Sequence, residues 1–421
     1  MNQILSNNGM KHTKKEISTR QLLILVVPIF EPKLFTQYSV LQGLYIVFNV
    51  LELIYFLVSL TRRNERYLNL PVLGWIAYCA YLLLPMVFNN NYGGLLQWGR
   101  MSLTVLNAIL LFEYVYKSNF EKLVYVIATY GVCLLSINLV SIFMFPKGII
   151  EPELYYMKDN AIYFLGIKTA FTTMIFSTVA AAGTLFYLNQ KKYRGLFALS
   201  IFISMLNIFS KMISTAVIGC ILVLLLVIAN KLLKIDLPFP ILVLFAVLLQ
   251  IGVVFLNIQN VFSDLFEVLF NKDATLSSRT YIWENAKNLI LSSDALNILF
   301  GNGMTKQYTF VPYAGGYWQP HNQLLAWLYT GGLFGTAMIT GFFCLLSQWK
   351  KRHNQLYIYL SIMSFAVLFL SITEVYFDVV SCYIPILLLH YAEAVVNPKI
   401  RKEPSNSNQQ KNIVKVYQKG K

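Results

Sequence analysis

Long apolar runs recur along the whole chain, and most of them have about the length of a membrane-spanning helix. A helix needs roughly 20 apolar residues to cross the hydrocarbon core of a bilayer. Of the 421 residues, 57% are hydrophobic and 13% are charged, whereas charged residues make up about 25% of a typical soluble domain. The sequence therefore predicts an all-α, polytopic membrane protein.

The length of the runs predicts about twelve transmembrane helices, of which the first and the seventh are short. The predicted spans are 21–36, 39–60, 70–88, 97–116, 123–145, 161–188, 196–210, 212–230, 238–257, 321–347, 356–373 and 375–396. They divide the chain into a cytoplasmic segment (1–20), nine helices (21–257), a large extracytoplasmic loop (258–320), three helices (321–396) and a basic, disordered cytoplasmic tail (397–421).

The excess of positive charge supports an even number of spans. The chain holds 34 Lys and Arg residues against 19 Asp and Glu, a formal net charge of +15. Lys and Arg accumulate in the cytoplasmic loops of membrane proteins. With an even number of spans and the N-terminus inside, most of the basic residues fall on the cytoplasmic side. We therefore predict cytoplasmic N- and C-termini, a lipid bilayer around the chain and no nucleic-acid partner.

The predicted loop 258–320 is too long to be a simple connection, because loops above about 12–15 residues are usually functional or disordered. It contains Trp283, Phe310 and Trp318 together with several tyrosines. Disordered segments are poor in aromatic residues. The composition therefore predicts a folded cap over the membrane helices.

Several classes of site have no candidate in the sequence. There is no G-x-G-x-x-G, no P-loop and no D-x-D pair, so neither ATP nor a nucleotide sugar has a predicted site. The five cysteines fall inside apolar runs and lack the spacing of metal ligands. We therefore predict no metal, no cofactor and a substrate that comes from the membrane.

One histidine is placed for chemistry on the predicted outer side. His321 follows Pro320 and precedes Asn322 at the start of the tenth predicted span. Free N–H groups and the dipole at a helix N-terminus attract anions, and a neutral imidazole there could take a proton from a hydroxyl. The alternative is a hydrogen-bonded interfacial histidine without a catalytic role.

Three cations on the predicted outer side are candidates for binding phosphate. Arg279 lies four residues before Trp283, so that both share one helix face, and its planar guanidinium can bind two oxygens at once. Lys211 lies between two short spans, and Arg100 lies at the start of the fourth span. If the three converge, they form a nest for a diphosphate. The alternatives are a solvated loop arginine and cations that snorkel to the interface.

Two carboxylates are predicted at the outer end of the last span. Glu374 and Asp378 have the i, i+4 spacing that puts side chains on one helix face. They could accept hydrogen bonds from sugar hydroxyls, or they could be a partner for Lys211. A hydrated helix end is the alternative.

Taken together, these residues resemble the motifs of the O-antigen polymerase and ligase superfamily, the Wzy/WaaL-like membrane glycosyltransferases. Members carry R-x3-W in a large outer loop, then G-x-G, then H-N-x-x-L with downstream glycines, and an S-R pair at an earlier span. The corresponding residues here are Arg279 with Trp283, Gly301 with Gly303, His321 with Asn322 and Leu325, Gly332 and Gly335, and Ser210 with Lys211. Lysine replaces the arginine of the S-R pair, and Asn297 replaces a proline often found before G-x-G.

The resemblance implies a GT-C-like, metal-independent glycosyltransferase at the outer face of the bacterial cytoplasmic membrane. Its substrates would be oligosaccharides linked to undecaprenyl diphosphate. It implies that His321 activates the acceptor hydroxyl, that Arg279 and Lys211 hold the diphosphate, and that Asn322 and Trp283 belong to the site. Arg100 is a further candidate for the diphosphate because it is another cation on the predicted outer side. A chain-length regulator and a flippase would be further partners.

On this basis the sequence predicts a polymerase of capsule, exopolysaccharide or O-antigen repeat units. One alternative is a ligase that transfers finished glycan to a terminal acceptor, and the residues do not separate the two. The other is a flippase for lipid-linked oligosaccharides. A flippase should carry its charges along a central cavity and needs no large outer loop, whereas the predicted charges here gather at one face.

Overall fold

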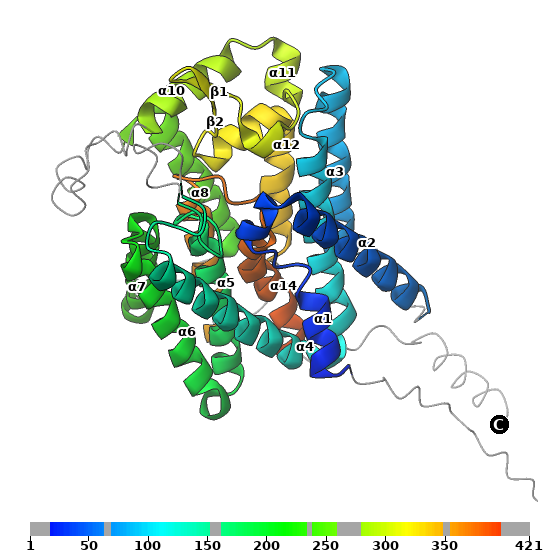
Figure 1. The fold of residues 1–421 in the computed structure, drawn as a ribbon, viewed down its shortest axis with the longest axis vertical. Coiled ribbons are helices and arrows are strands. Elements are labelled where there is room, and N and C mark those ends of the chain that lie inside the picture. The colour runs from blue at the N-terminus through cyan, green and yellow to red at the C-terminus, as the bar shows by residue number, and fades with distance from the viewer. Residues whose placement is uncertain are drawn as a thin grey trace, which may run out of the picture.

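The computed structural model describes residues 17–62, 69–151, 161–233, 238–258, 279–347 and 354–396. The predicted tail, nearly all of the N-terminal segment and the first part of the predicted loop lie outside these residues. The described chain is almost entirely helical (Figure 1). Its α-helices are α1 (Thr19–Val26), α2 (Ser39–Arg62), α3 (Leu70–Phe88), α4 (Leu95–Met144), α5 (Phe171–Leu188), α6 (Gln190–Ser210), α7 (Ser214–Leu233), α8 (Phe239–Phe255), α10 (Arg279–Leu291), α11 (Ala295–Phe300), α12 (Gln323–Leu345), α13 (Gln355–Leu370) and α14 (Ile384–Val396).

Short 3-10 helices and one small hairpin complete the described elements. They are η1 (Lys33–Gln37), η4 (Lys306–Tyr308), η5 (Val380–Tyr383) and the antiparallel pair β1 (Val311–Tyr313) and β2 (Gly316–Trp318). Among the described residues, seven helices are long and apolar enough to cross a membrane, and α8, α13 and the segment ending in α14 are shorter apolar helices. The all-α, multi-pass class is confirmed. The count of twelve spans and the full loop stay predictions.

The two predicted spans 97–116 and 123–145 form one helix, α4, of 50 residues. Its backbone leaves the helical region at Asn119, where φ is −135° and ψ is 25°. A sharp change of direction inside a helix needs such a local break in the hydrogen-bond ladder. The bend separates two apolar arms that pack against α5 and α6 on one side and α2 and α3 on the other.

Four predicted spans are α-helical over only part of their length, which corrects the predicted boundaries of 21–36, 161–188, 356–373 and 375–396. The parts without α-helix lie at 27–38, 161–170 and 371–383, and we call them the three irregular segments. Non-helical backbone at membrane depth is tolerated where protein or a water-filled cavity surrounds it. Apolar composition alone does not distinguish such a segment from the helix that continues it.

Buried polar side chains bind the backbone of the second irregular segment. The Asn138 side-chain oxygen accepts a hydrogen bond from the Leu165 N–H at 2.8 Å, and the Ser141 hydroxyl accepts one from the Phe164 N–H at 3.2 Å. A backbone N–H that is buried in a protein without a hydrogen-bond partner costs about 1–3 kcal/mol of stability. These α4 side chains therefore replace the helical bonds that the segment lacks.

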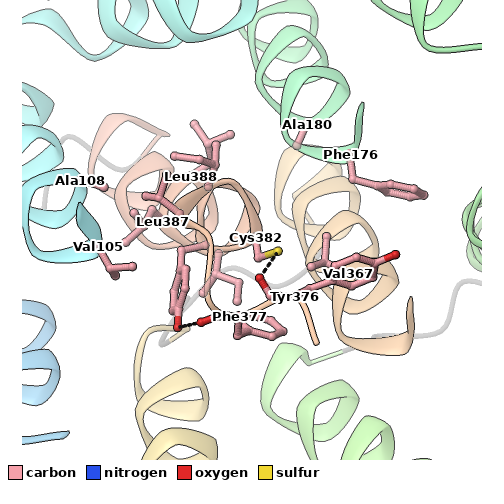
Figure 2. Packing of buried hydrophobic residues seen from close by; sticks show 14 of the residues in the cluster. Val105, Ala108, Phe176, Ala180, Val367, Tyr376, Phe377, Cys382, Leu387 and Leu388 are labelled. Carbon is pink, nitrogen blue, oxygen red and sulfur yellow. Dashed lines mark hydrogen bonds between the residues drawn. The ribbon is translucent and has the colours of Figure 1, made fainter. Parts of the chain in front are cut away.

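The third irregular segment, 371–383, is fixed in the same way inside the main core (Figure 2). Figure 2 shows one of its internal bonds, from the Cys382 thiol to the Tyr376 carbonyl at 3.0 Å. The Tyr383 hydroxyl donates to the Phe377 carbonyl, also at 3.0 Å. The Gln323 side-chain oxygen accepts from the N–H groups of Tyr376 and Phe377. Apolar residues of α4, α5, α13 and α14 surround it.

The elements α10, α11, β1 and β2 form a cap at one end of the bundle, beside the start of α12 (Figure 1). The Phe310 and Tyr329 rings stack with centroids 3.7 Å apart and planes 5° apart, which joins the cap to α12. The prediction of a folded cap is consistent with the described residues 279–320.

Two glycines of the motif let the cap approach α12 closely. Gly332 has φ of 63° and interrupts α12, and Gly301 has φ of 92°. A Cβ on Gly332 would lie 2.4 Å from the Leu299 carbonyl oxygen, and one on Gly301 would lie 2.5 Å from the Thr330 carbonyl oxygen. Both neighbours are backbone atoms, so neither can yield as a side chain would.

We expect Gly332→Ala to destabilise the protein, because alanine adds both a clash and a backbone cost of about 1–2 kcal/mol at positive φ. The total loss should exceed roughly 2 kcal/mol and lower the thermal unfolding temperature of the protein in detergent. Gly341→Ala is the matched control, since it lies in the same helix and its Cβ would meet nothing within 4 Å. Equal unfolding temperatures for the two variants would contradict this account of Gly332.

Candidate active site

His321 is held in an unusual backbone conformation immediately before α12. Its φ of 45° lies in the left-handed region, which is costly for a residue with a side chain and often marks a functional position. Asn322 caps α12, because its side-chain oxygen accepts from the Leu325 N–H at 2.9 Å. The Asn322 amide also donates to the Ile372 carbonyl at 2.9 Å. These bonds tie His321 to the third irregular segment.

A carboxylate of that segment binds the imidazole. Glu374 Oε2 lies 2.9 Å from His321 Nδ1. A carboxylate only accepts hydrogen bonds, so Nδ1 must carry a proton, and the neutral ring then has its lone pair on Nε2. The Glu374 side chain is 8% exposed, whereas that of His321 is 25% exposed. The buried carboxylate therefore orients the ring, and a quarter of the His321 side chain remains exposed.

The same carboxylate binds Arg279, the first residue of α10. Arg279 Nη2 donates to Glu374 Oε1 at 2.5 Å. Burial opposes ionisation of Glu374, but its interactions with His321 and Arg279 outweigh burial and hold the pKa of Glu374 below its ordinary value. Glu374 thus bridges the imidazole and the guanidinium, and we call these three residues the His–Glu–Arg cluster.

Trp283 supports the backbone of the cluster. It lies one helical turn after Arg279 on α10, is only 2% exposed, and its indole N–H donates to the His321 carbonyl at 3.2 Å. The spacing R-x3-W therefore has a structural reason here. The arginine reaches the carboxylate and the tryptophan fixes the histidine.

A polar cavity of about 290 Å³ lies beside the cluster, and Glu374 lines it. The three irregular segments and the start of α4 form most of its wall. Two further ion pairs belong to the lining: Arg100 with Glu31 at 2.5 Å, and Lys33 with Asp378 at 3.5 Å. Non-helical backbone and charged side chains thus occur together here, as expected for a cavity at membrane depth.

Residues 194–340 match the family model described as O-antigen ligase, Wzy_C. The chain carries a Wzy_C domain of the Wzy/WaaL family. The match confirms the resemblance drawn from the motifs. No curated protein and no solved structure matches the chain. The Wzy_C domain indicates a membrane glycosyltransferase of ligase or polymerase type in the synthesis of surface polysaccharide.

The bounds of the Wzy_C domain divide the site. Arg279, Trp283 and His321 lie inside the domain, whereas Glu374 and Arg100 lie outside it. The His–Glu–Arg cluster and its cavity therefore combine the Wzy_C domain with the chain on both sides of it. Among the described residues, no group of three or more His, Cys, Asp or Glu side chains is placed to hold a metal ion.

Two predicted roles are corrected by the geometry. Glu374 and Asp378 do not share a helix face, because 371–379 is irregular and held by Gln323. Glu374 pairs with Arg279 and His321 and not with Lys211. Helix periodicity assigned both carboxylates to an α-helix, whereas they lie in irregular backbone before η5.

The three cations that were predicted to form one nest each bind a different partner in this structure. Arg100 lines the cavity with Glu374 but is bound to Glu31. The Lys211 ammonium donates to the Pro146 carbonyl at 3.0 Å and lies 4.4 Å from the centre of the Tyr163 ring. Lys211 is not among the residues that line the cavity.

Glu31 and Lys33 are site candidates that the sequence analysis missed. They lie inside the first predicted span, 21–36, where they interrupt the apolar run. Ionisable residues at membrane depth are functional candidates by default. Applied to this run, that rule would have indicated both.

Proposed function

We propose that the protein is a polymerase of surface polysaccharide repeat units. It transfers the growing glycan from undecaprenyl diphosphate to the non-reducing end of the next lipid-linked repeat, at the outer face of the cytoplasmic membrane. The observation that carries the proposal is Glu374, because one buried carboxylate orients both a base and a cation. The Wzy_C match supports the same class of reaction.

In the proposed reaction His321 accepts a proton through Nε2 from the acceptor hydroxyl. The hydroxyl oxygen attacks the anomeric carbon of the donor glycan, and the bond from that carbon to the diphosphate oxygen breaks. The electron pair of that bond leaves with the diphosphate. General-base assistance of this kind contributes about 10²–10⁴-fold to a rate.

Arg279 would stabilise the diphosphate as it leaves. A guanidinium has five N–H donors, and the Glu374 bond uses one of them. The others can bind phosphate oxygens in pairs. A cation aimed at the developing charge in a site shielded from water lowers the barrier because it needs no reorganisation during the reaction.

We keep Lys211 as a second candidate contact to the donor diphosphate, on the strength of its position in the S-R motif. To reach the diphosphate, the Lys211 ammonium would have to give up its hydrogen bond to the Pro146 carbonyl. A lysine can make this move because its long stem is flexible. Asn322 and Trp283 would act through His321, by capping α12 and holding the histidine carbonyl.

The proposal is tested with purified protein in liposomes that contain lipid-linked repeat units and no nucleotide sugar. We expect a ladder of polymer on electrophoresis. Transport of the repeat without polymer would instead support a flippase.

The description of the matched family as O-antigen ligase makes a ligase the second candidate. A deletion strain separates the two candidates. Loss of the polymerase leaves single lipid-linked repeats, whereas loss of a ligase leaves long lipid-linked polymer. We expect single repeats.

A further inference from the structure

A second cavity, of about 410 Å³, lies between α2 and α4. Its lining is mainly apolar and includes Tyr45 and Ile46 of α2 and Leu95, Leu96 and Leu103 of α4. Leu95 and Leu96 are 46% and 61% exposed, and only 22% of the apolar window of α2 is buried. This cavity, which we call the α2–α4 groove, therefore opens toward the region that lipid would occupy.

One ion pair belongs to both cavities. Glu31, Arg100 and Thr104 line the α2–α4 groove and also the polar cavity beside the His–Glu–Arg cluster. The Arg100–Glu31 pair therefore stands where an apolar space meets a polar one. The side chains are 22% and 17% exposed, so the pair can be reached from the cavities without being fully solvated.

The polar cavity has the chemistry of a site for sugar hydroxyls. Its lining carries glutamines and threonines in addition to the ion pairs, including Gln37, Gln97, Gln307 and Thr169. Amides and hydroxyls both donate and accept hydrogen bonds, and carboxylates accept them, as the hydroxyls of a glycan require. At about 290 Å³ the cavity lies near the lower end of the roughly 300–1,000 Å³ range of ligand pockets.

We propose that the α2–α4 groove holds the polyprenyl tail of the acceptor substrate, that Arg100 binds its diphosphate, and that its sugars extend through the polar cavity toward His321. The inference rests on the proposed function and names the site of one of its two substrates. Arg100 exchanges Glu31 for the diphosphate, whose oxygens fit the guanidinium fork. Glu31 is then free to accept hydrogen bonds from the glycan.

Arg100 is assigned to the acceptor and not to the donor because the two substrates differ in how far the diphosphate lies from the reacting atom. The donor diphosphate is the leaving group, so it must touch the reacting carbon beside Arg279. The acceptor diphosphate is separated from its reacting hydroxyl by the whole repeat unit. Arg100 is bound to Glu31, which is not part of the cluster, and is joined to the cluster by the polar cavity that Glu374 also lines, which is the arrangement that an acceptor needs.

The first test is photo-crosslinking of the full chain in liposomes with a photoreactive polyprenyl diphosphate. Gly99 lines the groove, and a Cβ added there would meet nothing within 4 Å. Gly99→Phe should therefore fill the groove and reduce labelling of the α2 and α4 lining peptides by about tenfold. Gly341→Phe also projects into open space, lines neither cavity, and should be labelled as the wild type is.

Wild-type protein without labels in α2 or α4 would overturn the inference, because the tail would then lie elsewhere. Equal competition by phosphatidylglycerol would overturn it as well, since the groove would then hold ordinary lipid. This test needs no transfer activity, so it stands even if the proposed function fails.

The second test compares two acceptors that carry the same sugars, one on polyprenyl diphosphate and one on a short soluble aglycone. Gly99→Phe should lower the ratio of kcat/KM for the long-tailed acceptor to that for the soluble one by about tenfold, and Gly341→Phe should leave the ratio unchanged. Equal losses for both acceptors would sink the assignment of the groove to the acceptor tail. Absence of any product from wild-type protein would instead count against the proposed function.

Discussion

Replacement of His321 by alanine should lower the rate of glycan transfer by at least about 100-fold, because the acceptor hydroxyl loses its base. In cells the variant should leave single lipid-linked repeats while the protein remains in the membrane at its normal level. The measurement is the polymer ladder from liposomes together with the glycan profile of the strain. A variant that still makes full-length polymer would remove His321 from the reaction.

His321→Asn separates the chemistry from the backbone. The residue has φ of 45°, and asparagine tolerates this left-handed conformation better than most residues do. The asparagine variant should therefore unfold at nearly the wild-type temperature and yet be as inactive as the alanine variant. If asparagine restored activity, the histidine would serve only to shape the start of α12.

Glu374→Gln should lower the rate of transfer by roughly 10²–10³-fold, although the substitution nearly preserves the shape of the side chain. An amide is neutral and cannot balance the charge of Arg279. Its NH₂ group can also donate to His321 Nδ1, which would place the ring proton on Nε2, where the proposed base needs a lone pair. Glu284→Gln is the control, because Glu284 pairs with Lys287 on the surface of α10 and is 51% exposed. Wild-type rates in both variants would contradict the bridging role of Glu374.

The same carboxylate should make the stability of the protein depend on pH. The pKa of Glu374 is lowered in the folded protein by His321 and Arg279, against the effect of burial. Its ionised form therefore stabilises the fold above the ordinary carboxyl range, and this contribution is lost as the pH falls through the lowered pKa. Thermal unfolding of Glu374→Gln in detergent should lack that part of the dependence, and an unchanged dependence would assign it to other groups.

The residues of the sequence motifs lie together in the structure, and their roles in a reaction stay predictions. Arg279, Trp283 and His321 meet in the structure as the motif order suggested, because motif residues keep their spacing on α10 and at the start of α12. The motifs could not indicate Glu374 as the common partner of Arg279 and His321. Helix periodicity assigned it to a continuous span, and the irregular backbone that places it depends on Gln323, a residue about 50 positions away.

The apolar pattern had a similar limit. It located most membrane helices, such as α3 and α6, but it extended helices through the three irregular segments. Hydropathy records how apolar a stretch is and not which neighbours bind its backbone. The side chains of Asn138 and Ser141, which hold residues 161–170, can be identified only after the tertiary contacts are known.

The division of the cluster between the Wzy_C domain and the flanking chain has a practical consequence for protein engineering. A fragment covering only 194–340 would contain the histidine and the arginine but not Glu374, which joins them. Such a fragment should be inert even if it inserts into a bilayer. Chimaeras that exchange specificity between related proteins should therefore move the flanking segments 1–193 and 341–421 together with the middle.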